Sequence, residues 1–198
     1  MAAPALAPVT RQVSSRTAAA PDPSGQERRQ PLAAAVAELP VLDASGRRVP
    51  FGELFRERRA VVVFVRHFLC YTCKEYVDDL AKIPKNFLQE ANVALIVIGQ
   101  SSYHHIEPFC KLTGYCHEIY VDPEREIYKR LGMKRGEEIT SSGDPVQQGG
   151  TLILGPGHYI HFIHRDRNRL DHKPINSVLQ LVGVQHVDFT NRPPVIHV

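Results

Sequence analysis

The stretch AVVVFVRHFLCYTC, residues 60–73, decides the fold of this 198-residue chain. It opens with an uninterrupted apolar run rich in β-branched valine, which predicts a strand covered by helices on both faces. Apolar residues at helical spacing then predict a helix over about 71–89, with a kink at Pro84. Cys70 and Cys73 therefore fall where the central strand has ended and the helix begins, the edge at which open α/β sheets place their sites.

Strands and helices alternate on the C-terminal side of this stretch. Strands are expected at 93–98 and 118–121, and helices at 102–113 and 124–131. A hairpin of two further strands, 151–154 and 159–164, is followed by a last helix at 174–182. On the N-terminal side, residues 36–54 predict a short hairpin. This order predicts an α/β fold with a mixed central sheet flanked by helices.

Composition divides the chain into three parts. Residues 1–31 are rich in Ala, Pro, Ser and Arg and predict a disordered tail, although Arg11 and Arg16 leave a mitochondrial transit peptide as an alternative. Residues 32–185 have the length of one domain, and 186–198 are expected to form an appended tail.

Charge and hydropathy exclude several classes of function. The formal net charge is +3, with no dense run of Lys and Arg to neutralise phosphates, so no nucleic-acid partner is expected. No apolar stretch approaches the roughly 20 residues that span a bilayer, so no membrane partner is expected either. The first residues lack the apolar core of a secretory signal. We therefore expect a cytoplasmic protein whose thiols are reduced.

The Cys70-Tyr71-Thr72-Cys73 motif carries the chemistry. The first turn of a helix presents unpaired N–H groups and a positive dipole end, which favour a thiolate and lower its pKa. Two intervening residues allow the two sulfurs to form a reversible disulfide that stores two electrons. Arg66 and His67, just upstream, would add positive charge if they point toward the sulfurs.

Two alternatives to redox chemistry stay open at this point. A CxxC motif is half of a zinc site, but His161 and His164 would point to opposite faces of a strand, and no second CxxC is present. We therefore expect neither a metal nor another cofactor. Alternatively, Cys70 and Cys73 are inert buried residues, as cysteines often are.

The order of elements around the CxxC resembles the thioredoxin fold in its peroxiredoxin-like branch. The run GDPVQQGGTLILGPG, residues 143–157, followed by His164-Arg165 and Asp171-His172, resembles the peroxiredoxin-like 2 family, which is related to the AhpC/TSA antioxidant proteins. Together with the CxxC, these segments make the resemblance specific. It covers most of the chain.

The resemblance implies a thiol-dependent redox protein. Cys73 matches the peroxidatic position of true peroxiredoxins, and Cys70 matches the thioredoxin nucleophile. True peroxiredoxins carry a Thr three residues before the peroxidatic cysteine and an Arg on a later strand, and thioredoxins carry a cis-Pro there. Here these positions hold Cys70 and the stretch 148–151, which reads QGGT. Without groups that stabilise charge on the leaving oxygen, efficient peroxidase action is not expected.

Four further residues are candidates for supporting roles. Arg165 or Arg167 would replace the missing Arg if the last hairpin lay beside the CxxC, and a solvated charged loop is the alternative. Cys110 and Cys116 would resolve a sulfenic acid on Cys73, or they simply pack.

The functional expectation is a redox-linked regulator of intracellular signalling or metabolism with weak thiol oxidoreductase activity. The alternative is a thioredoxin-dependent enzyme that reduces a peroxide, an endoperoxide or a protein disulfide. The expected partners are a thioredoxin-like electron donor and signalling proteins.

Overall fold

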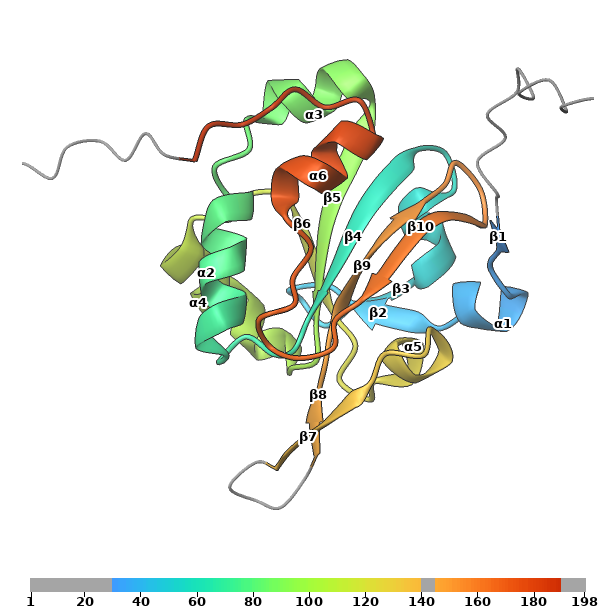
Figure 1. The fold of residues 1–198 in the computed structure, drawn as a ribbon. Helices are drawn as coiled ribbons and strands as arrows, with labels where there is room; N and C mark the ends of the chain where they lie inside the picture. The colour runs from blue at the N-terminus through green and yellow to red at the C-terminus, as the bar shows by residue number, and fades with distance from the viewer. Residues whose placement is uncertain (1–29, 140–144, 190–198) are drawn as a thin grey trace, which may run out of the picture.

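The computed structural model describes residues 30–139 and 145–189. Within them, one mixed sheet has the strand order β1-β10-β9-β4-β5-β6-β2-β3. Its strands are β1 (Gln30–Pro31), β2 (Pro40–Leu42), β3 (Arg48–Pro50), β4 (Arg59–Val65), β5 (Val93–Gly99), β6 (Glu118–Val121), β9 (Gly150–Leu154) and β10 (Tyr159–Arg165). Strands β4, β5 and β6 are parallel, whereas β9 is antiparallel to β4 and β10. The predicted mixed central sheet is confirmed (Figure 1).

Helices cover both faces of the sheet, as Figure 1 shows. One face carries α2 (Tyr71–Leu80), α3 (Lys85–Ala91), α4 (Ile106–Thr113) and α6 (Ile175–Leu181), with the short 3-10 helix η2 (Tyr103–His105) leading into α4. The other face carries α1 (Ala34–Ala37), the 3-10 helix η1 (Phe51–Phe55) and α5 (Glu126–Arg130). This is the helix–sheet–helix layering that the sequence predicts.

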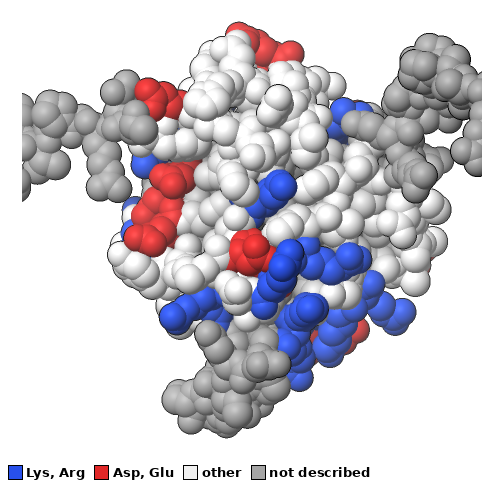
Figure 2. All heavy atoms as spheres, in the orientation of Figure 1, with Lys and Arg blue, Asp and Glu red and all other residues white. Residues whose placement is uncertain are grey.

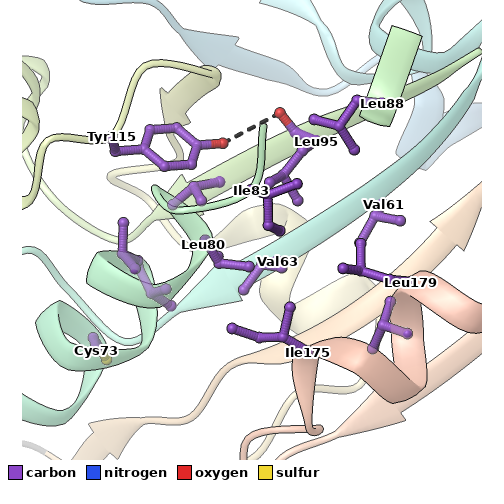
Figure 3. Packing of buried hydrophobic residues seen from close by; sticks show 14 of the residues in the cluster. Val61, Val63, Cys73, Leu80, Ile83, Leu88, Leu95, Tyr115, Ile175 and Leu179 are labelled. Carbon is purple, nitrogen blue, oxygen red and sulfur yellow. Dashed lines mark hydrogen bonds between the residues drawn. The ribbon is translucent and has the colours of Figure 1, made fainter. Parts of the chain in front are cut away.

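Strand β4 divides the core in two. Val61 and Val63 point into the cluster under α2, α3, α4 and α6, while Val62 and Phe64 point into the cluster under η1 and α5. All four side chains are at most 2% exposed, and full burial of one such side chain contributes about 1.5–3 kcal/mol. Figure 3 shows the first cluster, in which Cys73 lies at the α2 end.

The predicted single kinked helix over 71–89 is wrong, because the structure has two helices there. Helix α2 ends at Leu80, and α3 begins at Lys85 with Pro84 as its N-cap. A proline ring clashes with the carbonyl four residues earlier, which here belongs to Leu80, and proline has no N–H to donate. Pro84 therefore breaks the helix instead of bending it.

Between α5 and β9, the polar stretch around 134–150 contains a second, two-stranded sheet. Strand β7 (Arg135–Ile139) pairs with β8 (Pro145–Gln147), and Figure 1 shows this ribbon projecting from the body of the domain. Its pairs Arg135–Gln147 and Ile139–Pro145 are separated by a register irregularity.

Both predicted tails have their described ends packed on the domain. Gln30–Pro31 form β1 and pair with β10. Val187 is buried and exchanges two hydrogen bonds with the amide of Asn176, at 2.9 and 3.0 Å. The rest of both tails lies outside the described residues. No helix among residues 30–139 and 145–189 has the length and apolar character needed to cross a bilayer.

Candidate redox site

Cys70 is the N-cap residue of α2. Its backbone is extended (φ −81°, ψ 123°), and its carbonyl accepts the N–H of Lys74 at 2.9 Å, so the helix begins at the next residue. Residues 66–69 carry the chain from the end of β4 over the edge of the sheet to this point. The cysteine therefore lies at the positive end of a ten-residue helix, as the sequence predicts.

Cys73 lies one turn further along α2 and is fully buried. Its sulfur accepts a hydrogen bond from the backbone N–H of Arg66 at 3.4 Å. A hydrogen bond with Cys70, burial and the negative charge on Cys70 raise the pKa of the Cys73 thiol. All three effects favour the protonated form of Cys73.

Cys70 has the opposite electrostatic environment. A hydrogen bond from the Cys73 side chain makes the largest contribution to lowering the pKa of Cys70, and the Thr72 hydroxyl, 3.2 Å from the sulfur, adds to it. The backbone N–H of Cys73 and the positive charge of Arg66 also favour the thiolate, while burial opposes it. These contacts favour the thiolate form of Cys70 and the thiol form of Cys73.

Arg66 and His67 differ in the charge that they bring to Cys70. Arg66 is buried, and its charge lowers the pKa of Cys70. Burial is the largest influence on His67 and lowers its pKa. The Nδ1 atom of His67 accepts a hydrogen bond from the N–H of Leu69 at 3.1 Å. The expected positive charge therefore comes from Arg66, while His67 is neutral at pH 7.

Arg165 points away from the cysteines. Its Nε donates to the carbonyl of Leu131, at the end of α5, at 2.7 Å. A register shift between Ile160 and Phe162 reverses the alternation of β10, because Ile160 packs in the α5-side cluster and Phe162 against the α2-side cluster. Simple alternation from Ile160 would have turned Arg165 to the face of the sheet that carries α2. Arg167 is exposed and pairs with Asp171 at 3.8 Å.

Cys110 and Cys116 form a separate group. Burial and the charge of Cys116 raise the pKa of Cys110, which lies half-buried on α4. Cys116 is exposed beside a cavity of about 400 Å³ that Val93, the first residue of β5, also lines. Since the CxxC lies at the other end of the parallel strands, about 20 Å of strand separates Cys116 from it. The structure does not bring Cys116 to Cys73.

Two residues that contribute to the site were not predicted from the sequence. Thr72 lies inside the motif, so its spacing alone could have marked it. Tyr128 is fully buried on α5, and its hydroxyl donates to the carbonyls of Val65 at 2.6 Å and Ile98 at 3.0 Å. These hydrogen bonds connect the carboxyl ends of β4 and β5 beneath the motif. No local sequence pattern predicts this long-range contact.

The loop from 166 to 173 is fastened to α2. The ring of His172 stacks on Tyr76 at 4.6 Å between centroids, and its Nδ1 lies 3.0 Å from buried Asp166. His161 and His164 contact different backbone carbonyls, those of Gly155 and Asp171. No group of three or more His, Cys, Asp or Glu among the described residues is arranged to hold a metal ion.

A mixed sheet between two helical layers, with a dithiol at the start of the helix after the central strand, defines a thioredoxin-fold protein of the peroxiredoxin-like class. Among solved structures, a peroxiredoxin 6 of Arenicola marina matches 74% of this chain and 69% of its own, with a TM-score of 0.62 and 17% identity. That likeness shows the fold. The family model described as AhpC/TSA antioxidant enzyme matches residues 79–142.

Sequence relatives give the family directly. The chain is 75% identical to the bovine and to the human protein named Peroxiredoxin-like 2C, over 100% of both chains in each comparison. A chloroplastic thioredoxin-like protein of Arabidopsis thaliana is 30% identical over 71% of this chain and 68% of its own. The chain belongs to the peroxiredoxin-like 2C family. Its alignment to the bovine and human relatives spans 228 positions, 30 more than the 198 residues of this chain.

Proposed function

We propose that the chain is a dithiol oxidoreductase in which Cys70 is the nucleophile and Cys73 is the resolving thiol. The observation that carries this proposal is the asymmetry of the pair. Four groups favour a thiolate on Cys70, namely the Cys73 thiol, the Thr72 hydroxyl, the Cys73 backbone N–H and the charge of Arg66. The hydrogen bond with Cys70 and burial favour the protonated form of Cys73. A lowered pKa on one member of a CxxC pair is the feature that activates it as a nucleophile.

The proposed reaction transfers two electrons to a disulfide substrate. The Cys70 thiolate attacks one sulfur of the substrate, the substrate S–S bond breaks, and its second sulfur leaves as a thiolate that takes a proton from water. Cys73 then loses its proton and attacks the Cys70 sulfur, which releases the first substrate sulfur as a thiol. The protein ends as the Cys70–Cys73 disulfide, and a thioredoxin-like dithiol donor, in a reducing compartment such as the cytoplasm, restores it.

A protein disulfide suits this site better than a hydroperoxide. Leu69 and Tyr71, which flank Cys70, are 79% and 71% exposed, as expected for a contact surface. Arg165 faces α5, so it does not serve a leaving oxygen at the cysteines. We expect reduction of a peroxide or endoperoxide at Cys70 to be slow beside disulfide exchange.

Trapping experiments test this assignment. Reduced wild-type protein mixed with hydroxyethyl disulfide is expected to form an intramolecular Cys70–Cys73 disulfide, seen by peptide mass spectrometry. Cys73→Ser is expected to stop at a mixed disulfide on Cys70, and Cys70→Ser to remain unmodified at the motif. Accumulation of the adduct on Cys73 in the Cys70→Ser variant at the wild-type rate would reverse the two roles.

A second proposal is that the same dithiol acts as a redox-linked regulator of signalling or metabolism. Arg165 binds the Leu131 carbonyl and does not take the place of the peroxiredoxin Arg beside the sulfurs, and Arg66 is buried. This arrangement favours a slow redox switch over fast catalytic turnover. Cells that carry Cys70→Ser with Cys73→Ser should lose the oxidant dependence of any pathway that the protein controls. An oxidant response identical to wild type would refute the sensor role.

A further inference from the structure

Six exposed Arg and Lys side chains form a basic rim at the same sheet edge as Cys70. The members of the rim are Arg130, Lys134, Arg135, Arg165, Arg167 and Arg169. They come from two chain segments, which the Arg165 bond to the Leu131 carbonyl holds together. Figure 2 shows Lys and Arg gathered over the lower part of the face, around α5, β7 and the end of β10.

Strand register places the rim close to the nucleophile. Arg165 pairs with Gly150, and Gly150 pairs with Phe64 near the end of β4. Two strand spacings, about 10 Å, therefore separate the end of β10 from the end of β4, from which the chain turns toward Cys70. The following loop reaches α2 itself, where His172 stacks on Tyr76.

Few of the acids whose side chains the structure describes are paired with the rim. Among ion pairs between residues whose side chains the structure describes, only Arg167 of the six takes part, with Asp171 at 3.8 Å. A second acid, Asp166, is 2% exposed and faces His172 at 3.0 Å. The six cationic side chains are exposed, and exposed positive charge attracts a partner of opposite sign.

Exposed apolar side chains lie next to Cys70 and within the basic rim, where a partner protein would make contact. Leu69 and Tyr71 flank Cys70, and Leu170 is 74% exposed between Arg169 and Asp171. An apolar centre with a charged periphery is the usual composition of a protein–protein interface. Helix α2, which begins after Cys70, exposes Glu75. A flat anionic bilayer would be repelled by that charge, whereas a protein surface can complement both signs.

We propose that the basic rim docks the carboxylate-rich surface of a protein that exchanges disulfides with Cys70. This inference rests on the proposed function, because it names the class of partner for the same dithiol. The rim supplies long-range attraction, and Leu69, Tyr71 and Leu170 supply the apolar contact next to the reacting sulfur. A carboxylate-rich partner disulfide reaches Cys70 faster than a neutral one of equal chemistry.

Peptide disulfides of matched chemistry test the proposal. Each probe is a short peptide whose single cysteine is joined to thionitrobenzoate, with four flanking Glu, Gln or Lys residues. Attack by Cys70 forms a Cys70–peptide disulfide and releases the coloured thionitrobenzoate thiolate, and Cys73 then displaces the peptide thiol. At low ionic strength the Glu probe is expected to react about tenfold faster than the Gln probe, and the Lys probe slower. The advantage of the Glu probe should shrink as salt is added.

A matched pair of triple variants locates the effect. Arg130→Gln with Arg167→Gln and Arg169→Gln is expected to remove most of the preference for the Glu probe. The control, Arg56→Gln with Lys82→Gln and Lys85→Gln, loses the same charge away from the rim and should keep the preference.

The neutral reagent hydroxyethyl disulfide separates this proposal from the proposed function. Slow exchange with this reagent as well as with all three peptides would refute the nucleophilic role of Cys70. Fast exchange with equal rates for the Glu and Gln probes would refute the docking surface alone. Binding to phosphatidylserine vesicles that the rim variant abolishes, together with equal peptide rates, would assign the rim to a membrane and overturn the proposal.

Discussion

The sulfur of Cys73 accepts a hydrogen bond from the backbone N–H of Arg66 at 3.4 Å, so the residue that follows β4 is hydrogen-bonded to the second cysteine of the motif. This contact fixes Cys73 in the core beneath Cys70, where its thiol stabilises the Cys70 thiolate. Arg66 also contributes its charge to Cys70. One residue therefore positions the resolving thiol and activates the nucleophile.

Thr72 is predicted to tune the nucleophile. Thr72→Val removes the hydroxyl that lies 3.2 Å from the Cys70 sulfur, and the pKa of Cys70 should rise by about 0.5 to 1 unit. The rate of alkylation against pH measures this shift. Thr113→Val, on α4, removes a hydroxyl that donates to the Phe109 carbonyl and is the control. An unchanged pKa in Thr72→Val would show that the hydroxyl does not contribute.

Arg66, rather than Arg165, is predicted to supply the cationic charge. Arg66→Gln should raise the pKa of Cys70, Arg66→Lys should restore most of the lowering, and Arg165→Gln should leave it unchanged. Thermal unfolding of each variant reports whether the buried substitution disturbs the fold. A larger effect from Arg165→Gln than from Arg66→Gln would contradict the observed direction of the Arg165 side chain.

The stability of the reduced protein should depend on pH through both cysteines. The folded-state pKa of Cys70 is lowered, so its contribution is fully present above its unfolded pKa and is lost as pH falls toward the folded value. The pKa of Cys73 is raised, so its contribution is lost as pH rises above about 9, where the unfolded thiol ionises. Urea unfolding should show stability rising with pH toward about 9 and then falling. In Cys70→Ser the rise due to Cys70 should disappear.

Tyr128 is predicted to be structural. Tyr128→Phe removes a fully buried hydroxyl that donates to the Val65 and Ile98 carbonyls, and the free energy of unfolding should fall by about 1–2 kcal/mol. Tyr71→Phe, on the exposed start of α2, should change it by less than about 0.5 kcal/mol. Equal effects of the two substitutions on urea unfolding would contradict this assignment.

Local patterns predicted the parts of the fold that local physics determines. The apolar run of β4 and the helix start at Cys70 are readable because burial on two faces and a helix N-terminus leave clear signatures. The direction of the Arg165 side chain could not be predicted from the sequence. The irregularity between Ile160 and Phe162 reverses the alternation of β10, and no sequence pattern marks it. The contact of Tyr128 beneath the motif joins elements far apart in sequence.

The dependence of Cys70 alkylation on pH tests the central claim most directly. Reduced wild type, Cys73→Ser and Cys70→Ser are treated with iodoacetamide across the pH range, and mass spectrometry locates the label. The account predicts that wild-type Cys70 reacts at its full rate well below pH 8.5, that Cys73→Ser shifts this onset upward, and that Cys73 stays unlabelled. Ordinary titration of Cys70 near about pH 8.5, or faster labelling of Cys73, would contradict it.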